Sequence, residues 1–395
     1  MDEVKKNRDK KLRFCICTDS FVPRWDGISR FLLDLIPFLH DKYDVCVIAP
    51  NFSGGNADDF DFSKYGVDIV KIPVRKKSVD GYHLPRFEFF RILKEVNKAD
   101  VVFVQTIGPV GIASVFASLL SDVPRINYVH SVDWDLFSKA VGGSKIKKRF
   151  IRGITKVVVF VLYNFMNVIL VPSEEVALLL SKAWVKKPKM IVPLGTRTDV
   201  FVPPKNKYKA KQNVDVDPDS FVIGYCGRLS REKNLMVLYR AFKRLRKKYP
   251  GKVKFLAIGS GIAKFENLFK ADNDVYYVGR SNDTVKYYQA MDVFVMPSLL
   301  ETTGLVVLEA MSSGVPVIST AVGFAGKFFE EGKNGFLFNF HDEFELYVKL
   351  DNLFKGGELY RESIGREGRK TVLENANWRF TVRDIFTVVD SFKGD

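Results

Sequence analysis

The chain has 395 residues, 47% of them hydrophobic and 27% charged, and a formal net charge of +15. This length exceeds what one hydrophobic core usually supports, so we expect two domains, and no stretch reaches the roughly 18 consecutive apolar residues of a membrane span. The charge favours an acidic partner, such as phosphate groups, nucleic acid or an anionic membrane, without choosing among them.

The first half of the chain predicts alternating strands and helices. It starts with a polar, charged stretch at 1–13, which is not the pattern of a secretory signal. The predicted strands are 12–17, 45–49, 68–72, 101–104, 126–129 and 168–171, and the predicted helices are 28–39 and 110–120. Short apolar runs separated by helices are typical of a buried parallel sheet, so we expect a doubly wound α/β domain.

Four cysteines, Cys15, Cys17, Cys46 and Cys226, lie in short apolar runs that predict strands. None of them has the spacing of metal ligands. They predict buried thiols in a reducing compartment.

Two features follow strand 126–129. His130 would stand at its carboxyl end, where doubly wound sheets place ligands, and it is either a structural residue or a ligand contact. Further on, a basic segment with Lys145, Lys147, Lys148, Arg149 and Arg152 precedes the apolar run 157–163. Cationic residues beside exposed apolar ones suit an anionic membrane surface, but a solvated basic helix that runs into a core helix explains the pattern equally well.

The second half begins after Pro203 and Pro204, which with the polar stretch 205–214 predict a linker. Its predicted strands are 221–226, 253–258, 275–278, 293–296 and 315–318, and only helices are predicted from 340 onward. Because doubly wound sheets bind ligands at the carboxyl ends of their strands, two such domains facing each other would share one cleft.

Basic residues follow strand 221–226. A glycine turn at Gly227 leads to Arg228 and Lys233, five positions apart, before a helix. Arginine offers a forked donor and lysine a point charge, so the segment has the outline of a diphosphate clamp. A surface turn with solvated charges is the alternative.

The most informative stretch is 297–311, in which Glu301 and Glu309 lie eight positions apart. Glu309 falls in a helix that is apolar on nearly every face and therefore buried, so it needs either a hidden basic partner or ligand hydroxyls. Gly304 opens this helix, whose first amides form a natural anion site. A helix start with a carboxylate on each side suits a nucleotide sugar, which carries hydroxyls at both ends and phosphate in the middle.

Together these motifs resemble the retaining, GT-B-fold glycosyltransferases of family 4, also called group 1. The matching segments are 192–195, 227–234, 258–261, 278–280, 296–318 and 332–337, together with Trp378. The paired-glutamate block with its Gly-Val-Pro-Val-Ile tail is highly specific. The resemblance implies two doubly wound Rossmann-like domains facing a central cleft, at 1–203 and 204–376, with a C-terminal helix, 377–395, that crosses back to the first domain.

The resemblance also implies roles for single residues. Arg228 and Lys233 would hold the donor diphosphate and offset the charge on the leaving group. Glu309 would accept hydrogen bonds from the ribose hydroxyls, and Glu301 would contact the donor sugar. His130 would position the transferred sugar without attacking it. The implied catalytic residues are Arg228, Lys233, Glu301 and His130, and the implied donor contacts are Gly27, Arg228, Lys233, Gly261, Arg280, Glu301, Thr303, Gly304, Leu305 and Glu309. For Gly27, a glycine at a helix start is an equally good explanation.

The resemblance further implies that the donor phosphate takes the acceptor proton, and Arg228 and Lys233 would supply the positive charge, so no cofactor or metal ion is expected. Asp133 and Asp135 look like the metal-binding Asp-x-Asp motif of the other glycosyltransferase fold. They lie in the first half, away from the donor motifs, so we interpret them as a local feature near the acceptor side.

The sequence departs from the family pattern at Arg197, Thr303, Phe324 and Lys327, which leaves the donor sugar open. Its Glu-Thr-x-Gly form resembles members that glycosylate diacylglycerol or inositol lipids. We therefore expect a hexosyltransferase that uses a GDP-mannose or UDP-glucose type donor and a lipid-linked hydroxyl acceptor, in the cytoplasm and peripheral on the inner face of the cell membrane. A soluble or polysaccharide acceptor, and a non-catalytic nucleotide-sugar-binding protein, are the alternatives.

Two further classes are disfavoured. The first is a sugar epimerase or a phosphorylase of the same fold, and a phosphorylase would need a cofactor-lysine signature that the sequence lacks. A nucleic-acid-binding protein would be expected to show a recognised motif or an aromatic platform, and neither is found, so we expect no nucleic-acid partner.

Overall fold

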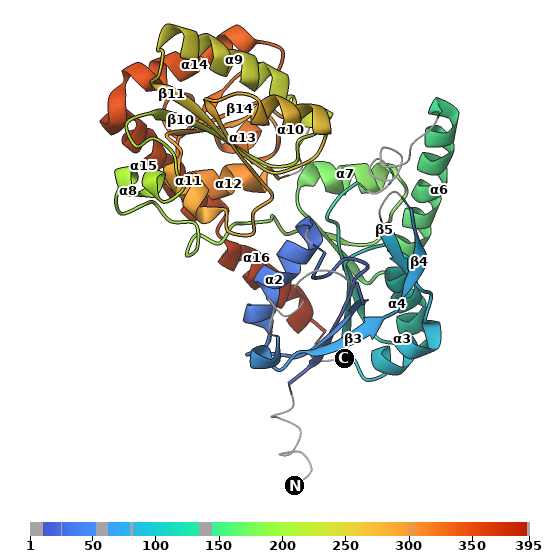
Figure 1. Cartoon of the computed structure of the whole chain (residues 1–395). Helices are drawn as coiled ribbons and strands as arrows, with labels where there is room; N and C mark the ends of the chain where they lie inside the picture. The colour runs from blue at the N-terminus through green and yellow to red at the C-terminus, as the bar shows by residue number, and fades with distance from the viewer. Residues whose placement is uncertain are drawn as a thin grey trace. The chain divides into compact units, whose positions relative to one another are not determined.

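The computed structural model describes residues 11–392 except 25, 53–61, 80–81, 133, 135–143, 300 and 302, with the backbone alone at 76–79, 82–83 and 145. The chain forms two compact units (Figure 1). The first unit comprises Met1–Val192 and Val382–Asp395, and the second unit comprises Pro193–Thr381. Each unit contains a parallel sheet between helices, which confirms the predicted α/β class.

The first unit is built on a sheet with the strand order β3-β2-β1-β6-β7-β8-β9, in which the neighbouring strands run parallel. The strands are β1 (Arg13–Cys17), β2 (Asp44–Pro50), β3 (Asp68–Ile72), β6 (Val101–Val104), β7 (Arg125–Tyr128), β8 (Val168–Val171) and β9 (Lys189–Ile191). Successive side chains alternate between the two faces, so Phe14 packs on Tyr43 and Phe103 while Cys15 and Cys17 enter the core on the other face.

Helices cover both faces of this sheet. They are α2 (Gly27–Leu39), α3 (Phe89–Val96), α4 (Pro109–Leu120), α6 (Lys145–Asn164) and α7 (Glu174–Lys182). Helix α2 lies on the face of Phe14, where Phe31 contacts Tyr128 with 5.0 Å between ring centroids. The others share the core on the opposite face with Cys15, Cys17 and Cys46. These cysteines and Cys226 are buried free thiols, as predicted.

An antiparallel hairpin of β4 (Val74–Val79) and β5 (Tyr82–Pro85) was not predicted from the sequence. Its first strand contains the basic run 75–77 in place of the alternating apolar residues that mark a half-buried strand. The hairpin contacts α4 through β5.

The second unit is built on a parallel sheet with the strand order β12-β11-β10-β13-β14-β15. The strands are β10 (Phe221–Cys226), β11 (Val253–Ile258), β12 (Val275–Gly279), β13 (Val293–Met296), β14 (Val317–Ser319) and β15 (Phe336–Leu337). All five predicted strands are present, with β14 shifted by up to two residues. The central strands β10 and β13 are buried along their whole length and apolar on both faces, because they lie between two layers of helices.

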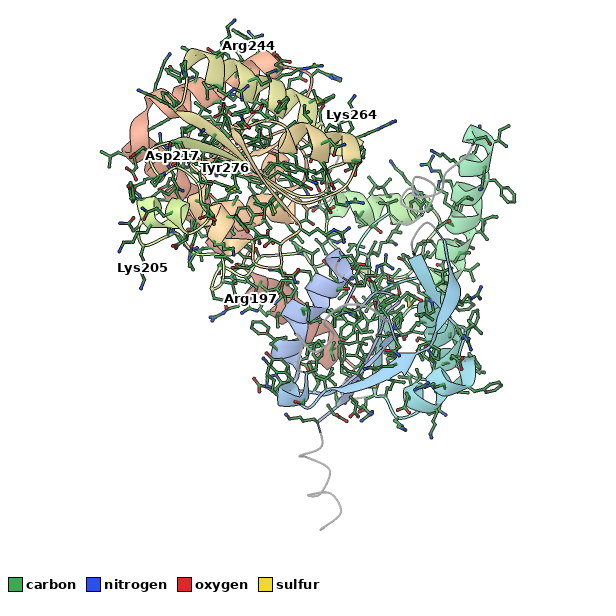
Figure 2. The ribbon with its side chains drawn as sticks, in the orientation of Figure 1. Arg197, Lys205, Asp217, Arg244, Lys264 and Tyr276 are labelled. Carbon is green, nitrogen blue, oxygen red and sulfur yellow. The ribbon has the colours of Figure 1, made fainter. Side chains whose placement is uncertain are left out.

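Figure 1 shows the helices that flank this sheet, and their buried side chains form two separate cores. The helices are α8 (Lys207–Gln212), α9 (Leu235–Lys248), α10 (Ala263–Lys270), α11 (Val285–Ala290), α12 (Leu305–Ser312), α13 (Gly323–Phe328), α14 (Glu343–Lys355) and α15 (Gly357–Asn375). Helices α9, α10 and α14 lie on one face and α11 and α12 on the other, and α15 contributes Ile364 to the first core and Val372 to the second. Basic side chains such as Arg244 on α9 and Lys264 on α10 point outward (Figure 2).

Helix α16 (Trp378–Asp390) belongs to both units. In its first turn the Thr381 hydroxyl donates to the carbonyl of Pro193 at 2.7 Å, within the second unit. The rest of the helix is part of the first unit, where the Tyr43 hydroxyl donates to the Asp390 carboxylate at 3.0 Å. The chain therefore passes between the units twice, and the last helix completes the first unit.

The stretch predicted as a linker contains α8, which is tied to the second unit by a buried ion pair. Lys211 Nζ lies 2.8 Å from Asp292 Oδ2, and the two side chains are only 7% and 4% exposed. The same Asp292 oxygen accepts a hydrogen bond from the Val222 amide, with 2.8 Å between nitrogen and oxygen. The polar composition of this segment predicted a linker. The segment instead docks on the second unit through the ion pair of Lys211 with Asp292, which composition alone does not reveal.

Replacing Asp292 by alanine is expected to destabilise the second unit by about 3–5 kcal/mol, because the ammonium of Lys211 would stay buried without its counter-charge. Urea unfolding followed by circular dichroism measures the change. Asp283→Ala is the matched control: Asp283 pairs with Lys286 at 3.8 Å on the surface, and its loss should cost about 0–1 kcal/mol. If the two substitutions lowered the free energy of unfolding equally, the buried ion pair of Lys211 and Asp292 would not be the anchor of α8.

Candidate functional site

The loops after β10 and β11 meet at the carboxyl edge of the second sheet. Gly227 follows β10 with φ +146°, and Gly259 follows β11 with φ +126°. A Cβ on Gly259 would lie 1.9 Å from the carbonyl oxygen of Gly227, and a Cβ on Gly261 would lie 2.3 Å from that of Leu229. Only glycine permits so close an approach. The predicted donor contact Gly261 is thus required by backbone packing.

Arg228 is presented by this loop toward solvent. The Tyr225 hydroxyl donates to the Arg228 carbonyl at 2.7 Å and fixes the backbone. The Arg228 side chain is 75% exposed and lies 3.6 Å from the Glu232 carboxylate, which is itself 44% exposed. An exposed pair at this distance holds the guanidinium weakly, so Arg228 is available to an anionic ligand.

Lys233 and Glu301 form an ion pair, in which Lys233 Nζ donates to Glu301 Oε1. Each side chain is 16% exposed. The Ser298 hydroxyl donates to the same Glu301 oxygen at 3.1 Å, and the Leu299 amide donates to the Glu232 carbonyl at 2.8 Å. The loops after β10 and β13 are therefore fastened together, and two residues predicted to hold different parts of a donor meet each other.

Helix α12 begins beside this pair. Its N-cap is Gly304, which has φ 76° in the left-handed region, and among the described residues no side chain caps the first turn. The neighbouring Thr303 uses its carbonyl to accept the amide of Phe324 at 2.9 Å, and Phe324 stacks on Phe328. The uncapped helix start carries positive dipole potential, which suits an anion next to Leu305.

Glu309 lies further along α12 and is half-buried. The Tyr288 hydroxyl donates to Glu309 Oε2 at 2.8 Å. Burial raises the pKa of Tyr288, so the phenol keeps its proton and remains a donor. The sequence required a hidden basic partner or ligand hydroxyls for Glu309, and the structure supplies a tyrosine. Tyr288 was missed because a tyrosine just before a strand reads as a core residue.

Arg280 follows β12 at the same edge of the sheet. Its Nε donates to the Ser260 hydroxyl at 2.7 Å, which links the loops after β11 and β12. Nearby, the Gly261 amide donates to Glu266 at 2.9 Å. The second unit thus brings Arg228, Lys233, Gly261, Arg280, Glu301, Thr303, Gly304, Leu305 and Glu309 to one edge of its sheet.

In the first unit, His130 follows β7 and is held by aromatic rings and an amide. Its ring lies 4.8 Å from Phe31 and 4.9 Å from Tyr128, centroid to centroid, and its Nε2 is 2.8 Å from Gln105 Oε1. Burial lowers the pKa of His130 to about 3, although the nearby Asp26 carboxylate raises it, so the imidazole is neutral near pH 7. A neutral ring can accept or donate one hydrogen bond, which fits the predicted positioning role and a structural role alike.

Gln105 was missed by the sequence reasoning. It follows β6, is 2% exposed, and its Nε2 has no hydrogen-bond partner among the described residues. A polar residue directly after the apolar run 101–104 was the available signal.

Gly27 begins α2, also at the carboxyl edge of the first sheet. The Asp26 carboxylate caps this helix by accepting the amides of Ile28 and Ser29, each at 3.0 Å. A Cβ on Gly27 would meet nothing within 4 Å. Internal packing therefore does not require glycine at this position.

Helix α6 presents the basic residues Lys147, Lys148, Arg149 and Arg152 to solvent, and Lys145 is described in its backbone alone. The same helix exposes apolar side chains at Ile146 (83%), Phe150 (68%) and Val157 (62%). We call these exposed apolar and basic side chains the α6 surface. Asp133 and Asp135 lie outside the described residues. Within the part of the chain that the structure describes, no helix is both long and apolar enough to cross a membrane.

Replacing His130 by glutamine should make the first unit less sensitive to acid. The folded state takes up the His130 proton near pH 3 and the unfolded chain near pH 6.5, so the wild-type protein loses stability as the pH falls through this window. Urea unfolding between pH 7 and pH 4 should give a smaller loss for the variant. His341→Gln, at an exposed position, is the control, and identical losses in all three proteins would contradict the expectation.

Comparison with known families gives two matches. The model of Glycosyltransferase Family 4 matches residues 25–200, and that of Glycosyl transferases group 1 matches residues 220–355. The first match lies mainly in the first unit and the second match lies within the second unit, where it includes Arg228, Lys233, Glu301 and Glu309.

Similar proteins include two curated glycosyltransferases. The capsular polysaccharide biosynthesis glycosyltransferase CapM of Staphylococcus aureus is 34% identical over 204 residues, which are 50% of this chain and 53% of CapM. The chain thus spans about half the length of CapM. The alpha-monoglucosyldiacylglycerol synthase of Acholeplasma laidlawii is 25% identical over 387 residues, which cover 90% of this chain and 94% of that enzyme.

Among solved structures, Anabaena Alr3699/HepE in complex with UDP-glucose has a TM-score of 0.76 at 16% identity, covering 96% of this chain and all of that one. At this identity the likeness speaks for the fold alone, which is the predicted GT-B fold.

Proposed function

The chain belongs to the family 4 (group 1) glycosyltransferases, and on that premise we propose that it transfers a hexose from a nucleotide-diphosphate sugar to a lipid-linked hydroxyl, with retention of the anomeric configuration. The observation that carries the proposal is the position of Arg228, Lys233, Glu301 and Glu309 at one edge of the second sheet, where Lys233 pairs with Glu301 just before the start of α12. Two cations, an uncapped helix start and two carboxylates match the alternation of charge and hydroxyl in such a donor.

In this proposal the donor diphosphate lies against Arg228, Lys233 and the amides near Gly304. Charge develops on the diphosphate as the bond to the sugar breaks, and preorganised cations stabilise that charge in the transition state. Lys233 then exchanges Glu301 for phosphate, which releases the Glu301 carboxylate to accept hydroxyls of the sugar. Glu309 accepts the ribose hydroxyls.

No protein base and no metal ion is needed for this reaction. The leaving phosphate takes the acceptor proton on the face where the bond breaks, so the enzyme works by positioning and electrostatics. His130 and Gly27, from the first unit, are proposed to contact the sugar and the diphosphate. A donor of the GDP-mannose or UDP-glucose type is compatible with these residues, and HepE, a neighbour in fold, was solved with UDP-glucose.

The lipid acceptor is supported by two observations. The relative matched over most of its length is named as a synthase of a glucosylated diacylglycerol. The α6 surface, moreover, exposes Phe150 and Ile146 beside Lys147, Lys148 and Arg149. Apolar side chains can enter the headgroup region of a bilayer while neighbouring cations attract anionic lipid. We therefore propose that α6 holds the enzyme on the cytoplasmic face of the cell membrane.

A polysaccharide acceptor is the second candidate, because CapM is named for capsular polysaccharide biosynthesis. Assays with lipid and with oligosaccharide acceptors distinguish the two.

Arg228→Ala is expected to lower kcat/KM for transfer from UDP-glucose or GDP-mannose by about 100-fold or more, because one donor to the developing charge is lost. The melting temperature should not change, since the side chain is 75% exposed. Release of UDP or GDP measures turnover. Arg240→Ala, at an arginine that is 61% exposed on α9, is the matched control, and unchanged turnover of Arg228→Ala would refute the proposed site.

Neutralising Lys147, Lys148 and Arg149 to glutamine should weaken binding to anionic vesicles by about 100-fold, since each basic residue near such a surface contributes about 1 kcal/mol. Co-sedimentation with phosphatidylglycerol vesicles at rising salt measures this loss. The control replaces the exposed basic residues Lys243, Arg244 and Lys247 of α9 by glutamine. If both triple variants bind like the wild type, or if salt has no effect, α6 is not the membrane contact.

A further inference from the structure

Tyr288 is a fully buried residue whose hydroxyl reaches the edge of the candidate site. Its ring is fixed on α11 by Phe201 and Phe294, each with 5.8 Å between ring centroids. Because the ring cannot turn away without opening this core, the position of its hydroxyl is set by the fold of the second unit.

The hydroxyl has one proton and two neighbours that could take it. It lies beside the Cys226 thiol and 2.8 Å from Glu309 Oε2. A carboxylate is a far better acceptor than a sulfur, so the proton goes to Glu309. The hydrogen bond fixes the rotation of the carboxylate about its last side-chain bond, a torsion that is otherwise broad.

We infer that Tyr288 is a positioning residue for ribose recognition, acting through Glu309, so that the site selects ribonucleoside over deoxyribonucleoside diphosphates. The inference rests on the proposed function. A carboxylate has about four acceptor positions, so one hydrogen bond from Tyr288 leaves capacity for ligand hydroxyls. Two neighbouring hydroxyls of a ribose can be met together only if the carboxylate plane is held in one orientation.

The test compares nucleotides that have and lack the ribose hydroxyls. Isothermal titration is carried out with UDP and GDP and with their 2′,3′-dideoxy counterparts, on the wild type and on Tyr288→Phe. The variant keeps the ring and its packing and loses only the hydroxyl. We expect it to bind the preferred ribonucleotide about tenfold more weakly, which corresponds to about 1.4 kcal/mol, and to bind the dideoxy form as the wild type does.

Tyr287→Phe is the matched control, because Tyr287 is the adjacent tyrosine and its ring contacts Lys286 on the surface. A structural role for Tyr288 would weaken ribo and dideoxy forms alike. That result would overturn the inference while leaving the proposed function intact. A wild type that binds neither UDP nor GDP would overturn the proposed function and this inference with it.

A double-mutant cycle with Glu309→Ala keeps the inference testable if Tyr288→Phe is less stable. Removing the Tyr288 hydroxyl should have no effect on ribonucleotide affinity once the Glu309 carboxylate is gone. A persistent loss in that background would show that Tyr288 does not act through Glu309.

Discussion

Parallel strand direction is the constraint on which the candidate site depends. Strand β10 pairs with β13 in parallel, so both end at the same edge of the sheet. Lys233 and Glu301, which lie 68 positions apart in sequence, therefore meet in the loops that follow these strands. An antiparallel pairing would have sent one of them to the opposite edge. The same constraint places Arg228, Arg280 and the start of α12 at that edge of the sheet.

The ion pair between Lys233 and Glu301 has an energetic consequence. Both side chains are largely shielded from water, so burying either charge alone would cost free energy. By pairing, each charge offsets part of the cost of burying the other before any ligand arrives. In the proposed function, a nucleotide sugar offers phosphate to Lys233 and hydroxyls to Glu301, and a ligand with only one of these groups would leave a charge uncompensated. On that proposal the ion pair favours ligands that carry both groups, which is a form of specificity.

Sequence reasoning predicted much of this structure, for reasons that differ from element to element. Strands β10, β11 and β13 were predicted to the residue, because a strand buried on both faces is a bare apolar run. Helix α8 and the β4–β5 hairpin were not predicted, since charged residues build them and local pattern does not show where a charge finds its partner. In the candidate site, the sequence alone placed Arg228, Lys233 and Glu301 at the carboxyl edge of the second sheet, because each follows a predicted strand. The hydrogen bonds of Glu309 to Tyr288 and of His130 to Gln105 join distant segments and needed the fold.

Helix α16 bears on how the protein is made. On the ribosome the N-terminal unit of a protein usually folds first, while the rest is still being synthesised. Here Ile385 and Val389, buried in the first unit, are translated only after the whole second unit. Until then the hydroxyl of Tyr43 lacks its Asp390 partner. The unit that emerges first is therefore the last to be completed, and the nascent chain carries an unfinished core through nearly all of its synthesis.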